Sequence, residues 1–201
     1  MCNLYKTANS ATEIARLFGA QDSSRRANTP EMHYPGYPGL VVTDGTVRAM
    51  HWGFPLTLKG KQGQPLKPKP VNNARTDKLS GPFWRSSFEN RRCLIPVTAY
   101  AEAEGKKGSK TRTWFSLPGT EIFACAGLWR GSEEWGDCYS MVITEANEQV
   151  APIHNRMPVI VAQKDWPTYL EGSPRDAFAL CRPWGKVMTI ERTEQAWAGR
   201  Q

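Results

Sequence analysis

Cys2 is the residue whose type and place suggest covalent chemistry. Methionine aminopeptidase removes Met1 when the next residue is small, and removal leaves an amine and a thiol on one residue. Reference pKa values of about 7.7–8.0 and about 8.5 leave both groups a nucleophilic fraction at neutral pH. An aldehyde would form an imine with the amine, and the tethered thiol would close it into a thiazolidine. The alternative is an ordinary cysteine that happens to be second.

The segment NNAR at 72–75 contains a second pair of candidate residues, Asn73 and Arg75. We expect it to follow a loop and to open a helix. The Asn73 amide can donate and accept hydrogen bonds, and the Arg75 guanidinium suits phosphate. A helix start also presents free backbone N–H groups to an anion. Alternatively, Asn73 is a helix cap and Arg75 a solvated charge.

Glu102 and His154 are the candidates for proton transfer. Period-two counting places Glu102 on the same strand face as Tyr100, and an inward carboxylate there could move a proton. The alternative is an exposed carboxylate like Glu104. His154 precedes an apolar segment at a loop end, where an imidazole suits proton transfer near neutral pH. A lone histidine is more often structural. Arg156 follows and could hold phosphate.

The charge balance favours a polyanionic partner. The net charge is +7 and the sequence pI about 9.3. Trp52 and Trp84 could stack on nucleobases. Two basic loops could neutralise phosphates, and they consist of Lys59, Lys61, Lys67 and Lys69, and of Lys106, Lys107, Lys110 and Arg112. The alternative is solvated loop charge, with the tryptophans in the core.

The five cysteines do not predict a metal site or a disulfide framework. They form no C-x-x-C pair and their number is odd. Cys93, Cys125 and Cys138 stand in apolar runs and are expected to be buried, whereas Cys2 has no core to join by itself. We see no targeting segment and no apolar stretch long enough to span a membrane, so we expect a cytoplasmic protein.

The elements that must position these residues are mostly strands. A helix is predicted over 10–19, with Ser10 and Glu13 as a capping box and Gly19 as its stop. LVV (40–42) and TVRAMHWGF (46–54) predict a hairpin, and 57–70 a loop. Further strands are expected at 92–103, 113–117, 122–129, 138–144, 157–162 and 186–192, and short helices at 164–172 and 173–180. We therefore expect one β-rich α+β domain over 1–201, with antiparallel sheets forming a barrel-like core and short peripheral helices.

The order of these motifs resembles the SRAP (SOS response-associated peptidase) family. The motifs are Met1-Cys2, N-A-R (73–75), R-C-L-I-P (92–96) followed by Glu102, A-G-L-W (126–129), T-x-A-N (144–147) and I-H-x-R-M-P (153–158). The resemblance runs from Cys2 to about residue 190. It implies the SRAP fold and a sensor that shields abasic sites in single-stranded DNA, with no cofactor or metal.

The resemblance also implies roles for single residues. Cys2 would form the thiazolidine crosslink after aminopeptidase or autocatalytic removal of Met1, and Asn73 would orient the reacting centre. Glu102 would belong to the catalytic set, and His154 would assist sugar-ring opening and crosslink reversal. The implied contacts to the DNA backbone are Arg75, Thr144 and Arg156, and Trp52 lies in the M-x-W-G motif near the base-stacking wedge.

The sequence departs from the family pattern at two places. Asn3 and Leu4 follow Cys2, where the family often has Gly and Arg. The segment 99–103 reads AYAEA, where the family often has aromatic residues on both sides of the glutamate. Two other functions stay open at this point. They are a cysteine peptidase or amidase with Cys2 as nucleophile and His154 as base, and a plain single-stranded-DNA-binding module. We expect a monomer with no membrane partner.

Overall fold

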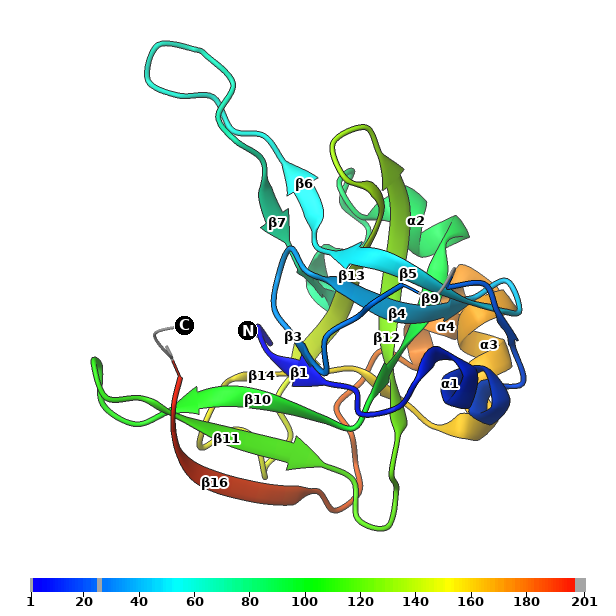
Figure 1. Cartoon of the computed structure of the whole chain (residues 1–201), viewed down its shortest axis with the longest axis vertical. Helices are drawn as coiled ribbons and strands as arrows, with labels where there is room; N and C mark the ends of the chain where they lie inside the picture. The colour runs from blue at the N-terminus through cyan, green and yellow to red at the C-terminus, as the bar shows by residue number, and fades with distance from the viewer. Residues whose placement is uncertain (1, 25–26, 198–201) are drawn as a thin grey trace.

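A closed five-stranded barrel organises the fold (Figure 1). A computed structural model describes residues 2–24 and 27–197. Antiparallel pairing runs from β5 through β4, β9 and β12 to β13, and a short parallel pairing of β13 with β5 closes the ring. The barrel strands are β4 (Pro38–Thr43), β5 (Thr46–Trp52), β9 (Arg92–Val97), β12 (Phe123–Ser132) and β13 (Gly136–Glu145). The expected barrel-like, β-rich fold with short helices is confirmed.

A second, five-stranded sheet lies beside the barrel (Figure 1). Its order is β16 (Thr189–Ala196), β11 (Thr111–Ser116), β10 (Ala99–Glu104), β1 (Tyr5–Lys6) and β3 (Met32–His33). The prediction of one strand over 92–103 is wrong, because the chain leaves the barrel at Thr98. The N–H and hydroxyl of Thr98 both donate to the Lys6 carbonyl, at 2.9 and 3.0 Å. This contact carries β10 into the second sheet.

Short strands extend the barrel at its edges. β2 (Gln21–Asp22) pairs with β5, β15 (Ile160–Val161) with β12, and both β8 (Asn73–Arg75) and β14 (Arg156–Pro158) with β13. The predicted strand 157–162 is therefore two strands on different neighbours. β6 (Phe54–Leu56) and β7 (Lys69–Val71) form the base of an arm that projects from the molecule (Figure 1). The arm corresponds to the predicted basic loop.

The helices are short. α1 (Ala11–Phe18) begins with the predicted capping box and ends at Gly19, whose φ of 61° is left-handed, so this prediction is confirmed. The others are α2 (Arg85–Asn90), α3 (Trp166–Glu171) and α4 (Pro174–Ala179), with 3-10 turns at Thr76–Lys78 and Gln163–Asp165. No helix in the described part of the chain is long and apolar enough to cross a membrane.

The prediction that NNAR opens a helix is wrong. Asn73–Arg75 runs parallel to β13, with Asn73 opposite Met141 and Arg75 opposite Ile143. The Met141 N–H also donates to the Asn72 carbonyl, at 2.9 Å. Because the backbone of this segment is used by the sheet, it does not form the helix start that was expected to bind an anion.

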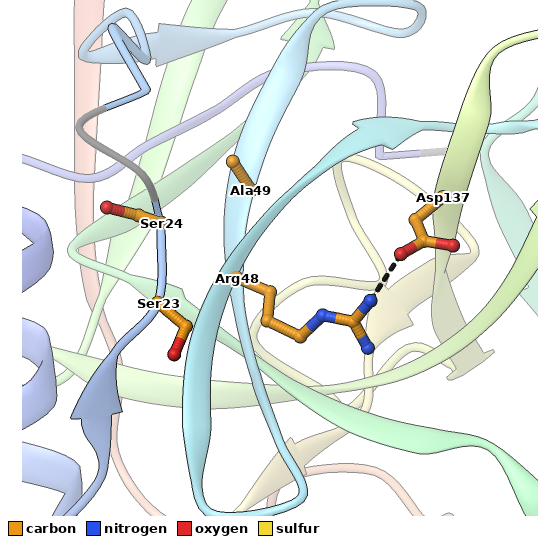
Figure 2. Close-up of a pocket in the computed structure, with 5 residues that line it drawn as sticks. All are labelled: Ser23, Ser24, Arg48, Ala49 and Asp137. Carbon is orange, nitrogen blue, oxygen red and sulfur yellow. Dashed lines mark hydrogen bonds and ion pairs between the residues drawn. The ribbon is translucent and has the colours of Figure 1, made fainter.

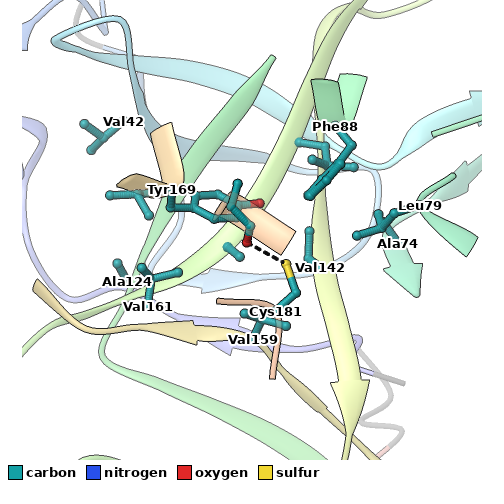
Figure 3. Close-up of a cluster of buried hydrophobic side chains, with 14 of the residues drawn as sticks. Val42, Ala74, Leu79, Phe88, Ala124, Val142, Val159, Val161, Tyr169 and Cys181 are labelled. Atoms are coloured by element: carbon teal, nitrogen blue, oxygen red, sulfur yellow. Dashed lines mark hydrogen bonds between the residues drawn. The ribbon is translucent and has the colours of Figure 1, made fainter. Parts of the chain in front are cut away.

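The barrel strands are buried on both faces. One face packs on the helices, in a cluster that includes Val42, Phe88, Val142, Tyr169 and Cys181 (Figure 3). The other face packs on the second sheet, in a cluster that includes Tyr5, Trp52, Tyr100 and Phe115. Cys93, Cys125 and Cys138 are buried as predicted. Cys2 is also buried, contrary to expectation, because β1 carries it into the second cluster. The assignment of 1–201 to one domain stays a prediction.

Candidate active site

Two neighbouring amides hold the backbone of Cys2. The side-chain Nδ2 groups of Asn72 and Asn73 both donate to the Cys2 carbonyl, each at 2.9 Å. Asn72 Nδ2 also lies 3.0 Å from Oδ1 of Asn3. On its other side, the Asn72 carbonyl accepts a hydrogen bond from Trp52 Nε1 at 3.1 Å. We call Asn72 and Asn73 the amide clamp. It fixes the backbone of residue 2.

Glu102 lies on β10 next to the same segment. Tyr5 pairs with Tyr100, and the Ala101 N–H donates to the Leu4 carbonyl at 2.9 Å, so the residues before Tyr5 run alongside Glu102. Glu102 is only 2% exposed, as the period-two pattern predicted. Burial raises the pKa of its carboxyl to about 7, although the positive charge of Lys110 lowers this pKa. At neutral pH this group can therefore both take up and release a proton.

The thiol of Cys2 is protonated at neutral pH. It is 1% exposed and lies 3.7 Å from the Leu4 carbonyl, to which it donates. Burial raises the pKa of the thiol well above its usual value, and the negative charge of Glu102 acts in the same direction. The thiol therefore needs a base before it can act as a nucleophile, and the carboxylate of Glu102 is within electrostatic range.

His154 is placed to hold either protonation state. The Arg156 N–H donates to Nδ1 at 3.0 Å, which assigns the proton of the neutral ring to Nε2. Nδ1 also lies 3.1 Å from the Arg156 carbonyl, which can accept from a protonated ring. Burial lowers the pKa of the imidazole, and the charges of Lys110 and Arg156 act in the same direction. Because Lys110 acts on both Glu102 and His154, the three side chains occupy one region.

Arg75 and Arg156 flank β13 from opposite sides. Arg75 lies on β8 opposite Ile143, and Arg156 lies on β14 opposite Glu145. Arg75 is exposed and pairs with Asp77, with Nη2 2.6 Å from Oδ2. The hydrogen bonds from Arg75 hold the pKa of Asp77 below its usual range, with a smaller effect from the charge of Arg156. The two guanidinium groups thus form one cationic area beside the site.

Three other predicted residues, Thr144, Trp52 and Trp84, are buried. Thr144 is 4% exposed on β13, opposite Met157. Trp52 is 0% exposed between Tyr5 and Tyr139, with ring centroids at 4.9 and 6.4 Å.

Trp84 is 7% exposed and packs on Phe54 and Phe83, at 5.2 and 4.7 Å. The expectation that Trp52 and Trp84 present stacking faces to bases does not hold, because aromatic neighbours pack against both rings in the core.

Sequence reasoning missed Asn72 and Lys110. The Asn-Asn doublet was visible, but only the strand register shows that both amides meet Cys2. Lys110 stood in a basic loop, where nothing marked it as different from Lys106 or Lys107. The two departures after Cys2 also have a structural use. Asn3 contacts Asn72, and Leu4 is buried with Ala99, Ala101 and Trp114.

A separate pocket lies on β5 and the start of β13. Arg48 and Asp137 form an ion pair there (Figure 2). The Arg48 guanidinium lies 4.9 Å from the Trp129 ring centroid. Among described residues, its lining also includes Ser23, Ser24 and Ala49, and none of the predicted site residues. Because none of the predicted site residues lines it, we do not take this pocket as the active site.

Solved structures share this fold. A protein from Bacteroides thetaiotaomicron superposes with a TM-score of 0.78 at 19% identity, covering 95% of this chain and 91% of its own. A protein from Bordetella bronchiseptica gives 0.79 at 22% identity, covering 96% and 99%. The barrel with its attached sheet is therefore an established architecture, and the Cys2 site lies between the two.

The sequence profile of the SOS response associated peptidase (SRAP) family matches residues 1–196, so the chain belongs to that family. The resemblance inferred from the motifs is confirmed. Relatives include the abasic site processing protein YoaM of Bacillus subtilis, 31% identical over 162 residues, covering 72% of this chain and 67% of YoaM. The abasic site processing protein YoqW of the same organism is 33% identical over 159 residues, covering 72% and 68%.

Proposed function

We propose that this protein processes abasic sites in single-stranded DNA by trapping their aldehyde on Cys2 after Met1 is removed. The product is a thiazolidine DNA–protein crosslink that shields the lesion. Two findings support the proposal: the chain belongs to the SRAP family, and its relatives YoaM and YoqW are named abasic site processing proteins. The names alone do not specify a covalent mechanism, so the chemistry rests on the site.

The observation that carries the proposal is the amide clamp on the Cys2 carbonyl. Thiazolidine formation uses two groups of the same residue, and both must reach one carbon atom. Fixing the residue by its carbonyl leaves its amine and thiol as the groups that react. Such fixation replaces an encounter in solution by a reaction at a set position, which lowers the entropic part of the barrier.

The steps balance with the loss of one water. The amine attacks the C1′ aldehyde carbon and gives a carbinolamine, whose oxygen takes up a proton and leaves as water. The thiol sulfur then adds to the imine carbon while the nitrogen takes a proton. Glu102, with a pKa of about 7, accepts protons at the aminothiol end. His154 donates to the sugar oxygen during ring opening and serves the reverse reaction.

Asn73 has a further part in this scheme. Its Nδ2 holds the Cys2 carbonyl, while its Oδ1 is buried and makes no hydrogen bond within residues 2–24 and 27–197. An amide oxygen accepts hydrogen bonds, so it suits the N–H of the reacting amine. In this scheme, the one side chain of Asn73 orients both the backbone of Cys2 and its amine.

The DNA backbone would lie along the cationic area. Arg75 and Arg156 offer guanidinium groups for phosphate, and Arg75 would exchange Asp77 for it. The projecting arm adds four exposed lysines: Lys59, Lys61, Lys67 and Lys69. Thr144 is buried, so we assign the backbone contacts to the arginines and lysines.

The peptidase alternative is less well supported. A cysteine peptidase attacks as a thiolate, so its cysteine needs a lowered pKa. Burial and Glu102 raise the pKa of the Cys2 thiol instead. Addition of a thiol to an imine within one residue tolerates this, because a neighbouring base can remove the proton as the ring closes.

The test is a denaturing gel with single-stranded DNA containing one abasic site. We expect a shifted band that survives denaturation, with an intact mass equal to protein without Met1 plus DNA minus one water. Cys2→Ala should abolish the band and keep salt-sensitive binding, whereas Cys138→Ala, a buried cysteine of the other cluster, should retain it. A band with Cys2→Ala, or with a tetrahydrofuran analogue that has no aldehyde, would refute the mechanism.

A further inference from the structure

We propose that the phenol of Tyr100 is a further catalytic group, which donates a hydrogen bond to the aldehyde oxygen as that oxygen becomes a hydroxyl and leaves as water. The proposal rests on the proposed function and adds a residue to it. Neither the motifs nor the comparisons assign a role to this hydroxyl.

The starting observation is a buried hydroxyl that lacks a partner. Tyr100 is fully buried, and its hydroxyl makes no hydrogen bond within the described ranges 2–24 and 27–197. The other fully buried tyrosines are satisfied: Tyr5 and Tyr139 bond to each other, and the Tyr169 hydroxyl donates to the Gly127 carbonyl at 3.1 Å. A buried polar group without a partner costs free energy, so it calls for an explanation. A bound acceptor would satisfy it.

The hydroxyl lies among the reacting groups. Tyr100 and Glu102 are two residues apart on β10, so their side chains point to the same face of the sheet. Ionisation of the Cys2 thiol or of the Glu102 carboxyl would raise the pKa of the Tyr100 phenol, so the phenol is within electrostatic range of both groups. In the proposed reaction the carbon bonds to the nitrogen and sulfur of Cys2, so we infer that its oxygen comes within reach of the phenol.

The ring is held in place by packing. It stacks on Phe115 of the neighbouring strand, with centroids 5.0 Å apart and planes 14° apart. The Tyr100 backbone is paired with Phe115 on one side and with Tyr5 on the other. A donor fixed before the reaction needs no reorganisation when charge develops on the oxygen, which is the condition for electrostatic stabilisation.

The phenol acts as a donor and keeps its proton. Burial raises its pKa well above the usual value, with the thiols of Cys2 and Cys125 and the charge of Glu102 in the same direction, so it stays neutral. As the amine attacks, the electron pair of the carbonyl moves to oxygen, and the phenol O–H stabilises it. The proton that completes the departing water comes from the acid groups of the site, so the tyrosine is unchanged.

The test compares Tyr100→Phe with Tyr169→Phe, which loses a satisfied buried hydroxyl on the opposite side of the barrel wall. Crosslink formation is followed under single-turnover conditions with saturating abasic single-stranded DNA. We expect Tyr100→Phe to slow it about 100- to 1,000-fold, the range for loss of one such donor. Its melting temperature should be unchanged or higher, because an unsatisfied hydroxyl is removed. Tyr169→Phe should show the reverse, with a lower melting temperature and the parent rate.

A second measurement identifies the step. Cyanoborohydride reduces the imine to a stable amine, so the rate of trapping reports the steps up to loss of water. We expect Tyr100→Phe to slow trapping by the same factor as crosslinking. If the parent protein crosslinks and Tyr100→Phe equals it in rate, the Tyr100 proposal is overturned and the proposed function stands. A slower Tyr100→Phe that also melts lower would make the hydroxyl structural and overturn the proposal as well. If the parent protein forms no adduct, both proposals fail.

Discussion

The side-chain amide of Asn73 donates to the backbone carbonyl of Cys2 across 2.9 Å. Asn73 stands on β8, which is held by parallel pairing to β13, so a barrel strand determines where the amide points. The N-terminal segment is thereby tied to a part of the chain some seventy residues later. The amide clamp thus couples the position of Cys2 to the barrel.

Replacing the clamp should slow crosslinking and spare DNA binding. Each amide makes a hydrogen bond of about 2.9 Å to Cys2, and one such bond contributes roughly 1 kcal/mol, or about fivefold in rate. We expect Asn72→Ala to lose about that factor and Asn73→Ala to lose more, because its Oδ1 is also removed. Adduct formation is timed at saturating DNA. Asn90→Ala, which loses a helix-surface amide bond to Ser86, is the control and should match the parent.

Glu102→Gln should change both stability and reactivity with pH. The folded carboxyl has a pKa of about 7, above its ordinary 4.5, so between these values the folded state binds more protons and the stability of the parent falls as pH rises. Gln does not titrate. We therefore expect the electrostatic part of the free energy of unfolding to be the same for Glu102→Gln and the parent near pH 4. At pH 8 we expect it to be higher for Glu102→Gln, by on the order of 1–3 kcal/mol. Urea unfolding at both pH values measures it.

The same variant should form the crosslink slowly. A positioned acid or base contributes about 10²–10⁴-fold, and we expect a loss of about 10- to 10⁴-fold. The parent rate should change with pH around 7, and this inflection should vanish with Glu102→Gln. An unchanged inflection would assign the titration to another group.

His154→Ala should slow both formation and release of the adduct. The imidazole contacts both the N–H and the carbonyl of Arg156, an arrangement that accepts either protonation state. We expect each rate to fall by about 10- to 10⁴-fold. Formation is timed with labelled abasic DNA, and release by a chase with unlabelled competitor. Parent rates in both directions would leave His154 a structural residue.

Arg75→Ala and Arg156→Ala should weaken binding before they affect chemistry. If each guanidinium holds one phosphate, each variant should lower the slope of log affinity against log salt by about 0.7–1. Fluorescence anisotropy with undamaged single-stranded DNA over a salt series measures this slope. Arg16→Ala, an exposed arginine on α1, is the control. A variant with the parent slope and affinity would show that its arginine is a surface charge only.

Much of the fold could be predicted from local patterns. The capping box of α1 and the hairpin predicted from 40–42 and 46–54 depend on short segments, and both formed as expected. The prediction of a helix at NNAR was wrong because these polar residues suit a helix start as well as a strand. Only the pairing with the distant strand β13 makes this segment a strand. The break at Thr98 has the same origin, since a hydrogen bond to Lys6 causes it.

The site was predictable by residue type more than by arrangement. The alternation of side chains along a strand predicted that Glu102 points inward, because this alternation depends on one strand alone. The burial of Trp52 and of Cys2 depends on the packing of the second sheet against the barrel, which no local pattern encodes. That the Tyr100 hydroxyl has no partner among residues 2–24 and 27–197 depends on every neighbour at once, so only the three-dimensional structure could show it.

The closure of the barrel has a consequence for the order of folding. β5 and β13 meet through two residue pairs, His51 with Cys138 and Trp52 with Tyr139, which join distant parts of the chain. Such long-range contacts form late, because loop closure costs entropy. Trp52 Nε1 also holds the Asn72 carbonyl, so the amide clamp is completed only when the ring closes. Under the proposed function, a partly folded chain without Met1 would have its aminothiol but not the clamp that positions it, so efficient reaction with aldehydes would wait until the barrel is complete.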